Sequence, residues 1–254
     1  MRVLSRPVTS GEPAEPVMSE APAAAGPSPK ARDPFVRFAG VAGLLAQVLA
    51  VVINVVLLAP PPDPPEGLDT PVIEVAAYVA EKGDMLALGH GLRYVAQVLL
   101  LIFGVGLYRL VKGPHDGAHQ GWAMVGLLAT VWIPAVGIIA QSIEGVAVWQ
   151  SETLAEQPQL ALALWGISTF LWNATLVPFS AQMLGFSLAG RASGVFPLWL
   201  VSLGLAAAAS GLVGAFATAS TAGEGWEVPL YVFLALVSPW MIITSIRMIR
   251  TETA

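Results

Sequence analysis

The sequence has no cysteine and few charged residues. Only 11% of its 254 residues are charged and only three are histidine. Without cysteine the chain can form no disulfide, thiolate metal site, c-type haem attachment or cysteine nucleophile. Charged side chains make up about a quarter of an ordinary soluble protein. Their scarcity therefore argues against a soluble domain and indicates that lipid is the solvent.

Other signatures of chemistry are also missing. His90 is the only histidine within an apolar segment, so a membrane haem would lack paired axial ligands. Glu144 has no second buried carboxylate for an intramembrane acid pair, and the chain contains no nucleotide-binding glycine loop or nucleophile elbow. His115 and His119 lie among glycines and a proline, which favours a loop over a metal site. We expect no catalytic residue, cofactor, metal or nucleic-acid partner.

What the sequence does contain is hydrophobic residues, which make up 56% of the chain. Six stretches reach the ~20 apolar residues that a helix needs to cross a bilayer. Their expected bounds are 35–59, 85–111, 122–149, 160–189, 196–217 and 228–249. Short connections predict that neighbouring spans are antiparallel. The predicted fold is all-α: a polytopic membrane helical bundle of six transmembrane helices over residues 35–250. Pro134, Pro178 and Pro239 are expected to kink their spans.

The flanks and the first loop differ from the spans. Residues 1–34 are rich in Pro, Ala, Glu and Ser, which predicts a disordered cytoplasmic tail; natural translation could start at Met1 or at Met18. After the first span, Thr70, Pro71 and the apolar spacing that follows predict a short amphipathic helix over residues 71–84 that lies along the membrane interface in the first outer loop. Residues 251–254 form a short cytoplasmic end.

The basic residues predict the orientation. Those in the short loops and flanks fall on one side of a six-span topology: Lys30, Arg32, Arg37, Arg109, Lys112, Arg191, Arg247 and Arg250. The alternate loops are acidic, with Lys82 as their single basic residue. Basic loops stay in the cytoplasm, so both termini are expected there. Abundant Ala, Gly, Val and Pro with little Lys suggests a bacterial genome, and hence the bacterial inner membrane.

Polar residues in the second and third spans form the candidate site. His90, Arg93 and Gln97 are three and four residues apart, so they share one helix face. At ~1.5 Å per residue, His90 and Arg93 would lie ~8 and ~12 Å from the outer end of their span. In the third span, Glu144 and Gln141 lie at a matching depth on one face.

An unpaired charge in the bilayer costs about 2.5–3.5 kcal/mol on insertion scales. We therefore predict that Arg93 and Glu144 form an ion pair, which Asn54 at the outer end of the first span could join. Two interpretations remain open. In one, His90, Arg93, Gln97, Gln141, Glu144 and Asn54 line a cavity that binds a ligand or relays a proton. In the other, Arg93 and Glu144 clamp two spans together and His90 extends to the interface.

The membrane region resembles a family of small six-span bacterial integral membrane proteins of unknown function. The resemblance covers about residues 36–250 and rests on the segments RFAGVAGLLAQVLA, LYRL, WAMVGLL, MLGFSLAG and PLWLVSLGLAAAASGLVGA, with an acidic first outer loop. It implies the six-span fold and assigns no activity or site residues.

The function that the sequence favours is an integral membrane protein that binds a small or lipidic ligand in an outer-leaflet polar pocket or supports a membrane complex. Its partners would be the lipid bilayer, that ligand, and a membrane protein or a second copy of the chain. A proton-coupled transporter of a small molecule is the alternative, and an intramembrane enzyme is the least favoured function. The sequence leaves the ligand and the oligomeric state open.

Overall fold

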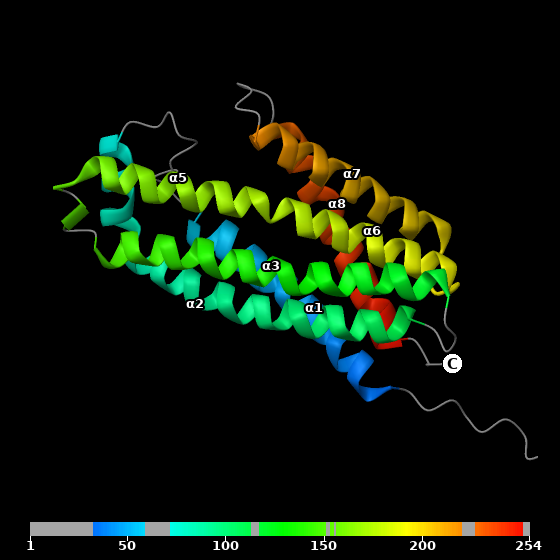
Figure 1. Cartoon of the computed structure of the whole chain (residues 1–254). Coiled ribbons are helices and arrows are strands. Elements are labelled where there is room, and N and C mark those ends of the chain that lie inside the picture. Colours follow the sequence, from blue (N-terminus) through cyan, green and yellow to red (C-terminus); the bar gives the residue numbers. More distant parts are fainter. Residues whose placement is uncertain are drawn as a thin grey trace, which may run out of the picture.

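A computed structural model of the chain describes residues 33–58, 72–112, 117–150, 153–154, 156–219 and 227–250. Every element with defined bounds in these residues is a helix (Figure 1). The elements are α1 (Pro34–Val51), η1 (Val52–Leu58), α2 (Val72–Val111), α3 (Ala118–Trp149), α5 (Pro158–Ala174), α6 (Leu176–Ala192), α7 (Leu198–Ala219) and α8 (Glu227–Arg250). Residues 1–32 of the predicted tail and the end at 251–254 lie outside the described residues.

Six stretches of helix are long and apolar enough to cross a membrane. They are Pro34–Asn54, Ala77–Val111, His119–Trp149, Gln159–Ala192, Leu198–Ala217 and Val228–Arg250. The predicted all-α bundle with six membrane-spanning helices is confirmed at this level. The bounds differ from those predicted mainly at the second span, whose helix extends further toward the N-terminus, and at the third, where the helix begins at Ala118 and includes His119.

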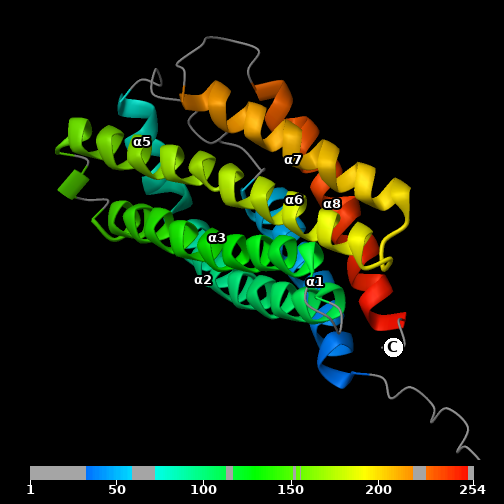
Figure 2. The same ribbon diagram turned by 45° about the vertical axis from the view of Figure 1, so that its right-hand side comes forward.

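The second span belongs to a much longer helix than predicted. Residues 72–84, expected as a separate amphipathic helix, continue without a break into α2, which has 40 residues. At ~1.5 Å per residue α2 is about 60 Å long, twice the ~30 Å of a hydrocarbon core. Its N-terminal turns, cyan in Figures 1 and 2, run at an angle to the rest of the helix.

The fourth span is divided in two. α5 ends at Ala174, Thr175 adopts a turn, and α6 begins at Leu176. Pro178, the third residue of α6, has no N–H to donate to the carbonyl of Ala174, so this helical hydrogen bond is missing, although the N–H of Thr175 still donates to Leu171 and that of Phe179 to Thr175. The Thr175 hydroxyl instead donates to the Trp172 carbonyl, 2.5 Å away. By contrast, α3 and α8 each continue through an internal proline.

The spans pack as a ring. Each of α2, α3, α6, α7, α8 and α1 packs on the next in that order, and α1 packs back on α2. α5 packs mainly on α3 and α2, because it continues the line of α6 past the end of α7 (Figures 1 and 2). Figures 1 and 2 show α7 at one edge of the bundle, with α5 and α3 extending past its end.

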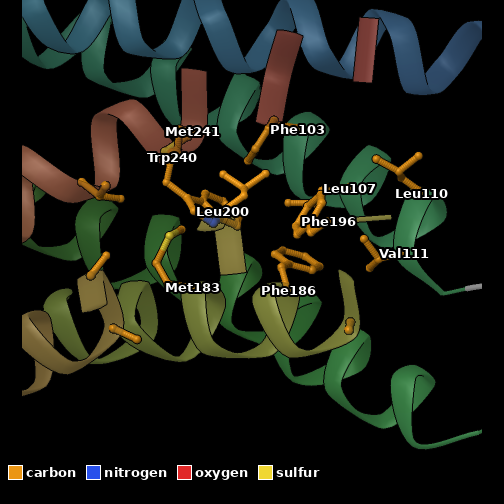
Figure 3. Packing of buried hydrophobic residues seen from close by; sticks show 14 of the residues in the cluster. Phe103, Leu107, Leu110, Val111, Met183, Phe186, Phe196, Leu200, Trp240 and Met241 are labelled. Atoms are coloured by element: carbon orange, nitrogen blue, oxygen red, sulfur yellow. The ribbon is translucent and has the colours of Figure 1, made fainter. Parts of the chain in front are cut away.

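A dense core fills the ring on the α6 side of Thr175. Phe103 of α2, Phe186 of α6, Leu200 of α7 and Trp240 of α8 are completely buried there (Figure 3). The backbones of α3 and α6 are in close contact, since a Cβ on Gly185 would lie 2.5 Å from the nitrogen of Gly126. No side chain fits at position 185, and the ring of Phe186 packs on Gly126 beside it.

An ion pair joins α1 and α2 at the dense end of the ring, away from the candidate site. Asp33 caps α1 by accepting a hydrogen bond from the backbone N–H of Phe35, at 2.9 Å, and its other carboxylate oxygen pairs with Arg109 of α2 at 2.8 Å. Helix caps of this kind contribute about 1 kcal/mol. The pair joins the start of α1 to the end of α2.

Candidate functional site

Glu144, near the C-terminal end of α3, accepts four hydrogen bonds from two other helices. Its Oε2 accepts from His90 Nε2 at 2.8 Å and from Arg93 Nη1 at 3.2 Å, both on α2. Its Oε1 accepts from Ser168 Oγ at 2.6 Å and from Trp172 Nε1 at 2.7 Å, both on α5. A carboxylate offers about four lone-pair sites, so this one has none left for another donor. We refer to these five residues as the Glu144 hub.

The predicted ion pair between Arg93 and Glu144 is present in the structure. His90 also bonds Glu144, whereas the clamp interpretation had it extend to the interface. The Arg93 guanidinium lies over the Trp172 ring, with 5.0 Å from its Cζ to the ring centroid. Because Trp172 also donates to Glu144, the aromatic ring and the carboxylate together fix the guanidinium plane.

The sequence analysis did not predict Ser168 or Trp172 as partners of Glu144. Both are neutral residues of the fourth span. The available signal was their spacing: the two residues are four apart, so they project from one face of α5. A buried carboxylate needs several donors, and a search for polar side chains paired at this spacing would have found them.

A cavity of about 880 Å³ lies beside the hub, on the α5 side of Thr175. Arg93, Glu144 and Trp172 form part of its wall. The remaining lining residues come from α1, η1, α2, α3, α5, α6 and α8 and are mostly apolar or aromatic; they include Ala46, Ala50, Ile53, Leu86, Ala96, Leu100, Ile133, Trp165, Phe179, Leu234 and Met241.

The other predicted site residues are placed differently from one another. Gln97 lines the cavity, and its Oε1 is buried with no hydrogen-bond partner among the described residues. Asn54 also lines the cavity, and its Nδ2 donates to the Ala50 carbonyl at 2.8 Å. Gln141 is completely buried and, like His90, is not among the residues that line this cavity.

Gln141 and Glu144 are three residues apart on α3, so their side chains are rotated by about 60° from each other around the helix axis. Glu144 bonds side chains of α2 and α5, whereas both amide atoms of Gln141 are buried and unpaired among the described residues.

Comparison of the chain with models of protein families, with curated proteins and with solved structures finds no match in any of the three. The resemblance to six-span bacterial membrane proteins therefore stays a prediction. The hub and the cavity are the features of the structure that bear on function.

Proposed function

We propose that this chain is an integral membrane protein that binds a small or lipidic ligand in the cavity beside the Glu144 hub. The observation that carries the proposal is the cavity of about 880 Å³, bounded on one side by Arg93 and Glu144. Pockets for small molecules measure roughly 300–1,000 Å³, and apolar walls with a few placed polar groups are typical of them.

The clamp interpretation accounts for the ion pair but not for the cavity beside it. A pair that only joined α2 to α3 would need its direct hydrogen bonds and no space beside it. Here the pair is directly bonded and also lines a large space. In the proposed function the hub has both roles, because it holds the wall of the binding site in place.

We also propose that the chain lies in the bacterial inner membrane with both termini in the cytoplasm. The support is the distribution of basic residues at the ends of the described helices: Arg109 lies in the last turn of α2 and Lys112 follows it, Arg191 lies in the last turn of α6, and Arg247 and Arg250 lie in the last turn of α8. All lie at the same end of the ring as the dense core. The hub and cavity would then face the outer leaflet.

Filling the cavity tests the proposal. Ala96 lines the cavity, so Ala96→Phe places an aromatic ring inside it, whereas Val98, two residues away on α2, is 56% exposed and faces outward. We expect the purified wild-type protein and Val98→Phe to retain a bound small molecule or lipid in native mass spectra. Ala96→Phe should reduce its occupancy about tenfold, the equivalent of ~1.4 kcal/mol. Equal retention by both variants would refute binding in the cavity.

A further inference from the structure

We propose, on the basis of the function proposed above, that the ligand is an amphiphile: an acyl chain with a head that carries hydrogen-bond-accepting oxygens. In this arrangement Arg93 binds the head, and the chain extends along the cavity toward the dense core. Three features support this assignment: the mostly apolar lining around the hub, the unequal donors and acceptors at the hub, and the guanidinium of Arg93 that is already held in place.

Apolar lining surrounds the polar groups of the hub. On α2 the lining passes from Arg93 to Leu100 in one direction and to Leu86 in the other. On the fourth span it passes from Trp172, which bonds the carboxylate, to Phe179. The lining also includes Gln47, whose amide donates to the sulfur of Met241. Seven residues of helix rise ~10 Å, so apolar side chains line the cavity about 10 Å from Arg93, as a molecule with a head and a chain requires.

The Glu144 hub offers hydrogen-bond donors to a ligand and no free acceptor. Glu144 already accepts four hydrogen bonds, so a ligand cannot donate to it without breaking one. Arg93 has five N–H groups, and only its Nη1 makes a hydrogen bond within the described part of the chain. The ion pair is therefore saturated on its anionic side and open on its cationic side, which favours a ligand head with oxygen acceptors.

Arg93 is also held in place before any ligand arrives. Glu144 fixes one edge of the guanidinium and the Trp172 ring lies against its face. The planar fork of a guanidinium matches the two oxygens of a carboxylate or a phosphoryl group, and less entropy is lost on binding when the fork is already ordered.

Gln97 also lines the cavity, one helical turn below Arg93. Its Oε1 is buried without a partner in the part of the chain that the structure describes; this oxygen accepts, so a water or a hydroxyl group can satisfy it and a carboxylate or phosphate oxygen cannot. Its Nε2 lies against α3, where a Cβ on Gly137 would be 2.6 Å away. Glycine at 137 thus leaves room for an amide that faces the cavity.

The test compares probes that share a chain and differ in their heads. Binding of dodecanoic acid, lauroyl-lysophosphatidylglycerol, dodecanol and dodecylamine to the full chain would be measured by native mass spectrometry. We expect at least one of the two anionic probes to bind about tenfold tighter than dodecylamine, because its oxygens accept from Arg93. Whichever anionic probe binds more tightly identifies the source of the ligand: a free acid or a lipid headgroup.

Matched variants separate the head from the chain. Arg93→Lys keeps the charge beside Glu144 but removes the fork, so the preference for anionic heads should fall about tenfold. Arg109→Lys, the same change at an ion-paired arginine on the same helix but away from the cavity, should leave that preference unchanged. The proposal is supported only if both results hold.

Failure of this inference can be told apart from failure of the proposed function. If all four probes bind equally and Ala96→Phe still abolishes their binding, the cavity binds ligands and the oxygen-bearing head is refuted. If Ala96→Phe leaves the binding of every probe unchanged, the cavity is not the site and both proposals are overturned. Preference for dodecylamine would also refute the assignment.

Discussion

At the scale of single residues, Glu144 organises the part of the bundle that surrounds the cavity. It is 9% exposed, and its four donors come from α2 and α5, so one carboxylate joins three helices. Hydrogen bonds to a charged group contribute about 1.5–3 kcal/mol each, and most of that is lost if the partner charge disappears while the other remains buried.

Removing the charge of Glu144 should therefore be costly. Glu144→Gln leaves the Arg93 cation without a counter-ion and places amide hydrogens against existing donors, so we expect a loss of about 3–5 kcal/mol in the free energy of unfolding. Ser168→Ala removes one of four donors and should cost about 1 kcal/mol. Unfolding of the detergent-solubilised protein by SDS, followed by tryptophan fluorescence, measures both.

A double variant supplies the control. Arg93→Met with Glu144→Gln removes both charges, so part of the stability lost in Glu144→Gln should return. If Glu144→Gln were no more destabilising than Ser168→Ala, the hub would not hold the three helices together.

The ion pair was predictable from the sequence, but the whole hub was not. Arg93 and Glu144 stand out because an isolated charge in lipid is unfavourable, so each requires the other. Ser168 and Trp172 carry no charge, and apolar spans commonly contain such residues. Their role depends on the packing of α5 on α2 and α3, which is a property of the tertiary structure.

At the scale of helices, the backbones of α3 and α6 are in close contact where they cross. Gly126 and Gly185 allow the two backbones to touch, and helices in lipid gain most of their affinity from such close packing. Gly204 and Gly211 of α7 are also buried, against side chains of α6 and α8.

A methyl group at the crossing should be destabilising. A Cβ at position 185 would lie 2.5 Å from Gly126 N and 2.7 Å from the Trp122 carbonyl, and both atoms belong to backbone that cannot move aside. We expect Gly185→Ala to lower the free energy of unfolding by about 1–3 kcal/mol. Gly91→Ala, at an open position of α2, should be neutral or stabilising by up to about 1 kcal/mol.

The same SDS titration distinguishes the two glycines. An equal response of Gly185→Ala and Gly91→Ala would mean that α3 and α6 separate easily, contrary to the packing described above.

Hydropathy predicted where the helices cross a membrane but not where their backbones break. The division of the fourth span at Thr175 depends on a missing donor at Pro178 and leaves the apolar composition unchanged. In the same way, residues 72–84 have the composition of a separate amphipathic helix, while the backbone joins them to α2. The composition of a segment indicates whether lipid or water surrounds it, and its backbone hydrogen bonds determine whether it forms one helix or two.

At the scale of the whole molecule, the ring has a dense end and an end with a large cavity. The dense end carries the basic residues at the C-terminal ends of α2, α6 and α8. If basic residues remain in the cytoplasm, the cavity end faces outward, and the angled N-terminal turns of α2 lie near the outer interface.

The absence of cysteine makes this orientation directly testable. Gly117, between α2 and α3, and Gln157, before α5, are both exposed and lie at opposite ends of α3. We expect a membrane-impermeant maleimide to label Gln157→Cys in intact cells and Gly117→Cys only after permeabilisation. The unsubstituted chain, which has no thiol, is the control, and the reverse labelling pattern would show an inverted protein.

α2 and α3 are consecutive in the chain, and this sets the order in which the buried charges meet during synthesis. Arg93 and His90 leave the ribosome first, Glu144 follows within the same helical hairpin, and Ser168 and Trp172 come after it. The cation thus gains its counter-ion as soon as one hairpin has formed. Only later does α5 add two neutral donors to the carboxylate, so the last helix to join the hub brings no charge to it.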